Sequence, residues 1–146
     1  MQLMLRAPAK KNIFVANLAD IADQRQEHFI CFSLNSSNQI INKHLVFKGT
    51  LTSTIVHPRE IFAVAIEDRA ARIVIAHNHP SGDVYPSKAD IETTQQLIAG
   101  GLLLGIPVHD HIIVVGNKHF SFRSEGLIGL DILTAERGAE HERTTD

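Results

Sequence analysis

The chain has 146 residues, of which 44% are hydrophobic and 21% are charged, and its formal net charge is −2. This is the composition of an ordinary globular domain, and a chain of this length buries about two thirds of its unfolded surface without needing disulfides or a structural metal. The apolar stretches are broken by Gly, Pro or His, the only cysteine is Cys31, and the longest basic run is Lys10-Lys11. The sequence therefore predicts no membrane span, no disulfide framework and no nucleic-acid site based on charge.

The two ends of the chain set expectations about its extent and location. The first residues lack the apolar core of a signal peptide, which predicts a cytoplasmic protein. The segment from Thr134 onward is polar and charged. We therefore expect one domain over residues 1–133 and a mobile tail over 134–146. Apolar strand edges leave room for a homodimer, although the sequence assigns no interface.

In the first half of the chain, the apolar spacing predicts a helix, a hairpin and a second helix. Residues 12–24 carry apolar side chains at helical spacing, whereas 27–35 alternate and are rich in β-favouring residues. The turn cluster 35–38 leads into a second strand over 39–47. Pro58 then opens a helix. Its apolar stripe consists of Ile61, Phe62, Ala65 and Ile66.

The second half of the chain predicts strands around one long helix. A continuous apolar run over 72–76 is typical of a strand buried on both faces. A helix over 88–99 follows, which we expect Gly100-Gly101 to stop. Two further strands, 108–115 and 118–122, form a hairpin. Together these elements predict an α/β fold in which helices pack on a mixed sheet.

The segment from His77 to Asp90 carries the strongest chemical pattern. It reads His-x-His, then seven residues, then Ser-x-x-Asp. His77 and His79 stand at i and i+2 where Pro80 ends a strand, so both side chains point to one face. Asp90 lies in the first turn of the next helix, where the loop returns it to the same point. Three such ligands leave the fourth position of a zinc site open for water.

A helix cap explains part of the same pattern. Ser87 and Asp90 have the spacing of a capping box, in which each side chain accepts a hydrogen bond from the other residue's backbone. Taken alone, that spacing favours the cap, and a His-x-His pair alone is a weak indication. The two histidines on one face, together with the Gly and Pro loop and the helix-start Ser and Asp, favour a metal site.

A zinc hydrolase also needs a carboxylate near the bound water to move protons. Glu27 is the best candidate, because it opens the 27–35 strand beside the polar residues Arg25, Gln26 and His28. On the sequence alone, a solvated glutamate at a strand end is the more frequent outcome for such a residue.

On these residues, the chain closely resembles the JAB (JAMM, or MPN+) metallopeptidase-like domain of the RadC family of bacterial DNA repair proteins. The matching stretches are Glu27-His28-Phe29, Gly49-Thr50-Leu51, residues 57–62, the block from His77 to Asp90, and residues 110–114. The resemblance implies a cytidine-deaminase-like α/β/α sandwich with zinc held by His77, His79 and Asp90. It also implies that Glu27 is the general acid/base and that Ser87 donates a hydrogen bond to the oxyanion of the tetrahedral intermediate.

Two departures from the family pattern bear on function. Full-length RadC proteins carry a helix-hairpin-helix region ahead of this domain, and 146 residues leave no room for one. We therefore expect any DNA contact of that region to be missing. His109 stands where an apolar residue is expected before Asp110-His111. We predict a structural role for His109, and we consider Asp110 as a residue that orients a ligand histidine.

Two functions follow from these observations. The first is a zinc-dependent hydrolase that cleaves a peptide or isopeptide bond in a peptide or protein substrate. The second is a DNA-repair-associated or mobile-element binding module that keeps a zinc site with little or no catalysis. The family association supports contact with nucleic acid, whereas the charge balance does not. Salt-dependent DNA affinity distinguishes the two, because phosphate contacts weaken steeply with salt.

Overall fold

The computed structural model describes residues 12–49 and 56–128. Within these ranges a five-stranded sheet has the order β2-β1-β3-β4-β5. The strands are β1 (Glu27–Leu34), β2 (Ile40–Gly49), β3 (Arg72–Asn78), β4 (Val108–Val115) and β5 (Lys118–Ser121). β3 and β4 pair in parallel and the other neighbours pair antiparallel, which confirms the predicted mixed sheet. The predicted domain boundary at residue 133 and the tail beyond it lie outside the described residues.

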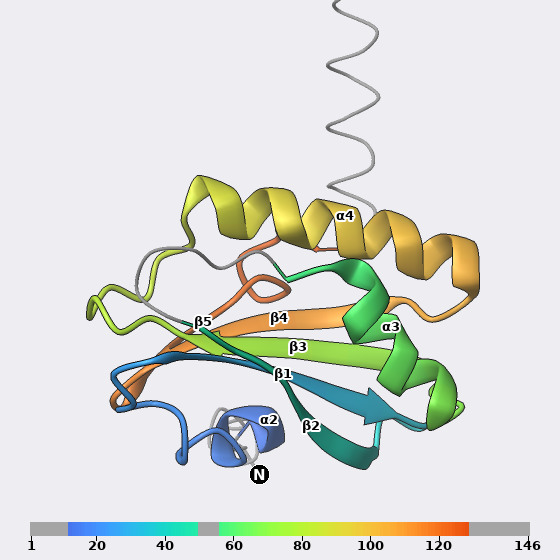
Figure 1. The fold of residues 1–146 in the computed structure, drawn as a ribbon, viewed down its shortest axis with the longest axis horizontal. Coiled ribbons are helices and arrows are strands. Elements are labelled where there is room, and N and C mark those ends of the chain that lie inside the picture. Colours follow the sequence, from blue (N-terminus) through green and yellow to red (C-terminus); the bar gives the residue numbers. More distant parts are fainter. Residues whose placement is uncertain (1–11, 50–55, 129–146) are drawn as a thin grey trace, which may run out of the picture.

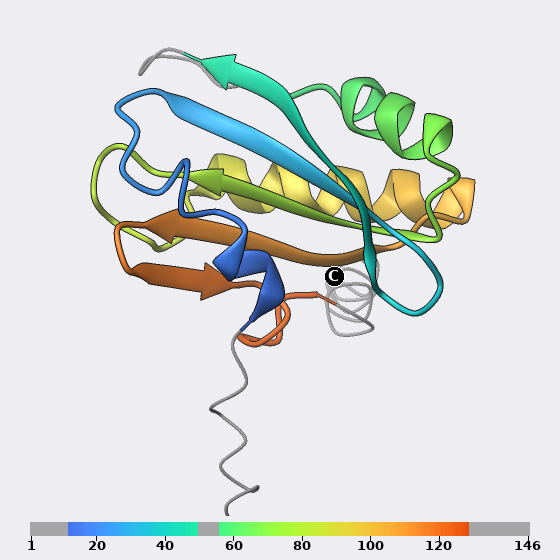
Figure 2. The same cartoon turned by 90° about the horizontal axis from the view of Figure 1, so that it is seen from below.

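Helices cover the two faces of the sheet unequally (Figure 1). α3 (Pro58–Glu67) and α4 (Lys88–Leu104) lie on one face and contact each other. The other face carries the one-turn helix α2 (Ile13–Ala16), which is seen clearly from below in Figure 2. The layer order is the α/β/α order that the family resemblance implies, with a thin second helical layer. None of the helices in the described part of the chain is both long and apolar enough to span a bilayer.

Each face of the sheet has its own apolar core, because successive side chains of a strand point to opposite faces. The core under α3 and α4 includes Phe29, Cys31, Phe62, Ile73, Ile75, Leu97 and Ile113. The core on the side of α2 includes Phe14, Leu18, Ile30, Phe32, Val74, Ile112 and Val114. By the same alternation, His77 in β3 and His111 in β4 point to the α4 side of the sheet.

The first predicted helix is wrong in length. Only Ile13–Ala16 is helical, and the chain continues through turns in which the Leu18 N–H bonds to Val15 O. The side chain of Asn17 donates to the Ile13 carbonyl at 2.8 Å, and such local contacts compete with helix propagation. Leu18 and Ile21 are nevertheless buried. The apolar spacing of this segment therefore reflects burial against the sheet and not a continuous helix.

The predicted stop of the last helix at Gly100-Gly101 is also wrong. α4 continues to Leu104 and ends at Gly105, whose φ of 73° is left-handed. A Cβ on Gly101 would lie 2.4 Å from the Ile106 carbonyl oxygen, and one on Gly100 would lie 3.1 Å from the Phe62 ring. Because the two glycines lack side chains, the Ile106 backbone and the Phe62 ring can pack closely against this part of α4. In α3, the predicted apolar stripe is wrong at Ile66, whose side chain is 54% exposed.

Candidate metal centre

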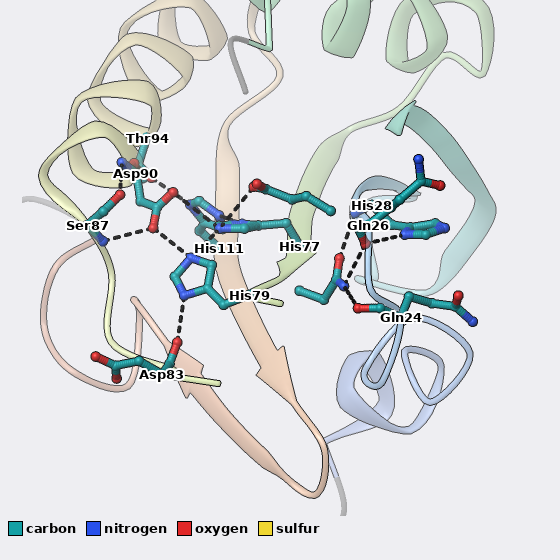
Figure 3. Close-up of polar contacts among 12 residues, drawn as sticks. Gln24, Gln26, His28, His77, His79, Asp83, Ser87, Asp90, Thr94 and His111 are labelled. Atoms are coloured by element: carbon teal, nitrogen blue, oxygen red, sulfur yellow. Dashed lines mark hydrogen bonds and ion pairs between the residues drawn. The ribbon is translucent and has the colours of Figure 1, made fainter. Parts of the chain in front are cut away.

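Three side chains with metal-binding groups meet where β3 ends and α4 begins (Figure 3). The Nε2 atoms of His77 and His79 are 2.9 Å apart. Asp90 Oδ1 lies 3.2 Å from the His77 Nε2, and Asp90 Oδ2 lies 2.9 Å from the His79 Nε2. All the ligand atoms of the group are within 4.8 Å of one another. The structure thus brings together the three residues that the sequence predicted as ligands.

The start of α4 holds Asp90 by a capping box. Ser87 Oγ accepts from the Asp90 N–H at 3.1 Å, and Asp90 Oδ2 accepts from the Ser87 N–H at 2.8 Å. The same Oδ2 atom faces His79. The cap and the metal group, which the sequence presented as competing explanations, are therefore both present. The cap fixes the carboxylate in the direction of the histidines.

The loop after β3 fixes the ring of His79. Its Nδ1 lies 2.7 Å from the carbonyl oxygen of Asp83. Because a carbonyl only accepts, Nδ1 carries the proton, and in the neutral ring the lone pair is on Nε2. The loop is itself closed by a Gly82 N–H to His79 O bond, with Gly82 at a φ of 94°. His79 therefore presents Nε2 to Asp90 and His77.

His77 sits in a fully buried environment on the α4 side of the sheet. The ring of Phe29 stacks against it at 5.4 Å with an interplanar angle of 8°. Its Nδ1 lies 2.8 Å from the Nε2 of His111, and the Nδ1 of His111 lies 2.6 Å from Thr94 Oγ1. Sequence reasoning did not find the roles of His111 and Thr94. The His109-x-His111 spacing was the available indication, but the position of β4 beside β3 was needed to interpret it.

Asp110 does not orient a ligand histidine. Its carboxylate accepts from the backbone N–H groups of His111 and Arg123 and from the hydroxyl of Ser121. Because neighbouring residues of a strand point to opposite faces, Asp110 is directed away from the face on which His111 meets His77. Asp110 instead holds the turn that follows β5 against β4. His109, with its carbonyl bonded to Arg123 Nε, also lies outside the metal group.

Glu27 lies beside the three-residue group. Its Oε1 is 3.9 Å from the Nε2 of His77. Asn78, the residue between the two histidines, holds the backbone on both sides of Glu27. Its Oδ1 accepts from the His28 N–H at 2.6 Å, and its Nδ2 donates to the carbonyls of Gln24 and Gln26 at 3.1 and 2.9 Å. Sequence reasoning missed Asn78, which couples the position of Glu27 to the strand that carries the ligands.

A small cavity opens between Glu27 and α4. Its volume is about 20 Å³, which is room for a single water molecule. Both carboxylates of the site, Glu27 and Asp90, contribute to its wall. The complete lining is Glu27, Phe29, Val56, Ala89, Asp90, Thr93 and His111.

The charges of the site are set by close contacts working against burial. Burial raises the pKa of the Asp90 carboxyl, but its close contacts with His77 and His79 outweigh burial and hold that pKa well below its usual range. Burial lowers the pKa of His79, but the hydrogen bonds to Asp90 and Asp83 outweigh it and the net pKa is raised. Burial lowers the pKa of His111 well below its usual value. Burial therefore favours the neutral imidazole form of His111.

The arrangement of donors fits a metal ion. With Nδ1 of His79 committed to the Asp83 carbonyl, a neutral His79 turns a lone pair toward Asp90 Oδ2 at 2.9 Å. Such a contact is favourable only when a positive group, a proton or a metal ion, lies at Nε2. Two imidazole nitrogens and one carboxylate form a common ligand set for divalent transition metals. Among the described residues, no other group of three His, Cys, Asp or Glu side chains comes together in this way.

Comparison with known proteins agrees with this geometry. Residues 9–127 match the family model described as a RadC-like JAB domain. UPF0758 proteins are among the relatives: one from Bacillus licheniformis is 49% identical over 111 residues, covering 76% of this chain and 50% of that protein. One from Desulforamulus reducens is 48% identical over 111 residues (76% and 49%), and one from Staphylococcus aureus is 46% identical over 131 residues (84% and 58%).

The share of each protein that is matched determines which properties of the relatives can be assigned to this chain. The chain spans about half the length of the curated relatives it matches, and their names state no activity. The family match covers most of the chain and includes Glu27 and the three side chains that could hold a metal ion. This chain belongs to the family of RadC-like JAB domains.

Proposed function

We propose that this chain is a zinc-dependent hydrolase that cleaves an amide bond, peptide or isopeptide, in a peptide or protein substrate. The observation that carries the proposal is the position of Glu27 next to the His77, His79 and Asp90 group, at the wall of a cavity that fits one water. Metal-assisted hydrolysis requires a carboxylate that lies close to the metal ligands but does not itself bind the metal.

Zinc is the metal we propose because its catalytic sites use three protein ligands of the imidazole and carboxylate type and keep a further position open. When bound, zinc supplies a Lewis acid that lowers the pKa of a coordinated water from about 15.7 to about 7. Glu27 Oε1 lies 3.9 Å from His77 Nε2, whereas Asp90 Oδ1 lies 3.2 Å from the same atom. We therefore assign Asp90 to the ligands and Glu27 to proton transfer.

A single carboxylate can carry out both proton transfers of the reaction. Glu27 accepts a proton from the attacking water as the water oxygen bonds to the carbonyl carbon of the amide. It then gives that proton to the amide nitrogen as the carbon–nitrogen bond breaks. The immediate products are a carboxylic acid and an amine, and Glu27 is returned to its ionised form. The acid then gives up the second proton of the water, which the amine takes up to become an ammonium ion at neutral pH.

We assign Ser87 a role at the carbonyl oxygen of the substrate. Its Oγ accepts from the Asp90 N–H, so the hydroxyl proton is not used in that contact and is available to donate. We propose that this hydroxyl donates to the developing oxyanion, as a side-chain donor does in other acyl-transfer sites. The capping box keeps Ser87 Oγ at the start of α4, close to the ligand carboxylate.

The test replaces Glu27 by Gln, which keeps the size of the side chain and removes the proton acceptor. We expect Glu27→Gln to retain about one zinc ion per chain and to lose at least ~100-fold of the turnover on a panel of fluorogenic peptides and lysine isopeptides. Glu67→Gln, at the exposed far end of α3, is the matched control and should match the parent in both measurements. Equal turnover of Glu27→Gln and parent would refute the assignment. A parent that takes up no zinc when zinc is supplied would refute the metal.

A further inference from the structure

We infer that His111 and Thr94 are positioning residues that set the tautomer of His77 and so keep its Nε2 free to bind metal. The inference deepens the proposed function at the same site and rests on its metal ligands, but it does not depend on amide hydrolysis. It is carried by a chain of three hydrogen bonds that begins at a backbone carbonyl and ends at His77.

The chain of contacts crosses three elements of the fold. In α4, Thr94 Oγ1 lies 2.7 Å from the carbonyl oxygen of Asp90. The same Oγ1 lies 2.6 Å from the Nδ1 of His111 in β4. The Nε2 of His111 lies 2.8 Å from the Nδ1 of His77 in β3. Thr94, His111 and His77 are fully buried, so bulk solvent does not reach these contacts.

The carbonyl at the start of the chain fixes the direction of every proton in it. A carbonyl only accepts, so the Thr94 hydroxyl donates its single proton to Asp90 O and accepts from the Nδ1–H of His111. With its proton on Nδ1, the neutral imidazole of His111 has its lone pair on Nε2. That lone pair accepts from the Nδ1–H of His77. In the neutral ring of His77, Nε2 then carries the lone pair and faces the other ligands.

The opposite direction fails at its first step. If the Thr94 hydroxyl donated to His111, no hydrogen would lie between Thr94 Oγ1 and Asp90 O, which are 2.7 Å apart. Two oxygens at that distance without a hydrogen repel each other, and a buried polar pair of this kind is costly. The reversed chain would also put a proton on the Nε2 of His77, where it would block a metal ion.

His111 acts through His77 and is not itself a ligand. Both of its ring nitrogens are occupied, by Thr94 and by His77. The ring also stacks on Phe122 at 4.5 Å with an interplanar angle of 10°, which holds its plane. His79 reaches the same tautomer through the Asp83 carbonyl directly, whereas the Nδ1 of His77 faces a histidine and needs the longer chain.

The experiment reads the tautomer in the metal-free chain by nitrogen-15 NMR of labelled histidines. In the parent we expect the His77 proton on Nδ1. Thr94→Ser keeps the hydroxyl and should keep this tautomer, whereas Thr94→Val and His111→Phe should return His77 to the tautomer mixture of a free imidazole. His111→Phe preserves the ring that packs on Phe122. A His77 proton on Nε2 in the parent would overturn the inference.

Zinc affinity, measured by competition with a chromophoric chelator, is the second readout. Thr94→Val and His111→Phe should bind zinc about 10-fold to 100-fold more weakly than the parent, and Thr94→Ser should bind it as the parent does. Unchanged affinity in both weakened variants would overturn the inference. Circular dichroism establishes that each variant folds, and the Thr94→Val and Thr94→Ser pair decides the question if His111→Phe does not.

The two proposals fail in distinguishable ways. If the parent shows the expected tautomer and zinc affinities but cleaves no amide, the hydrolase proposal is refuted and the role of His111 and Thr94 stands. If the parent cleaves amides but Thr94→Val and His111→Phe bind zinc as tightly as the parent, the role of these two residues is refuted and the hydrolase proposal stands. A parent that binds no zinc still reports the tautomer of His77.

Discussion

Asp90 belongs to two sets of contacts, and they can be separated by mutation. Its carboxylate accepts from the Ser87 main-chain N–H and faces both histidines, while its own N–H donates to Ser87 Oγ. Removing the Ser87 side chain breaks only the second bond of the cap, because the main-chain N–H of residue 87 remains. Removing the Asp90 side chain breaks only the first bond of the cap, because the main-chain N–H of residue 90 remains, but it also takes away a proposed metal ligand.

We therefore expect different outcomes for Ser87→Ala and Asp90→Ala. Ser87→Ala should lower the free energy of unfolding by about 1 kcal/mol, the usual cost of an N-cap, and should retain zinc. Asp90→Ala should lose zinc as well. Elemental analysis of the purified chains and urea unfolding measure the two effects. If Ser87→Ala lost zinc as completely as Asp90→Ala, the cap would be essential to the metal site and their separation would be wrong.

The proposed metal ligands and the residues that support them differ in how far the sequence predicts them. His77, His79 and Asp90 lie within one short segment, so their spacing and the family resemblance were sufficient to group them. Thr94 and His111 reach His77 only because β4 pairs in parallel with β3, with Ile75 opposite His111. The residue spacing within either strand does not predict the register in which two distant strands pair. Asp110 was considered in place of its neighbour because the face of β4 was unknown.

Among the elements, α4 shows why glycine is ambiguous in a sequence. Glycine-glycine is a frequent helix end, yet in α4 it lies within the helix and the end comes at Gly105. The chain doubles back so closely that the Ile106 N–H bonds to Gly101 O at 2.8 Å. The extent of α2 was mispredicted for a related reason, since burial against the sheet and helical spacing produce similar apolar patterns. Periodicity located the elements, and tertiary contacts set their ends.

The close approach at Gly101 gives a test at this scale. A glycine to alanine change inside a helix normally adds up to about 1 kcal/mol of stability. Gly101→Ala should instead lower the free energy of unfolding by about 1–3 kcal/mol, because its Cβ would lie 2.4 Å from the backbone oxygen of Ile106.

Gly100→Ala is the matched control for this change. Its Cβ would meet the Phe62 ring at 3.1 Å, and a side chain moves aside more readily than backbone, so the loss should be smaller. Urea unfolding of both variants measures the difference. A Gly101→Ala chain at least as stable as the parent would show that the contact with Ile106 does not limit this position.

Across the whole molecule, the proposed metal site ties together elements that are distant in the sequence. His77 comes from β3, Asp90 from α4, and Glu27 from the start of β1. These side chains converge only in the folded chain, so zinc that binds there stabilises the folded state. At a free zinc concentration about 100 times the dissociation constant, the stabilisation is about 2.7 kcal/mol.

This stabilisation should depend on pH in a direction set by His79. Burial lowers the pKa of His79, but its contacts with Asp90 and Asp83 raise it to a net value above the ordinary 6.5. In the metal-free chain the charged His79 therefore adds stability that is complete below pH 6.5 and is lost as the pH rises through the raised pKa. Zinc needs the same Nε2 without its proton, so proton and metal compete.

The zinc-induced rise in melting temperature should therefore be small near pH ~5.5 and should increase toward pH ~8. Differential scanning fluorimetry with and without zinc across this range measures it. His119→Gln, which changes an exposed histidine outside the group, should leave the rise and its pH dependence intact, whereas His79→Ala should abolish the rise. A rise that did not change with pH, or that survived in His79→Ala, would mean that zinc stabilises the fold through other side chains. The convergence of β3 and α4 would then need a different explanation.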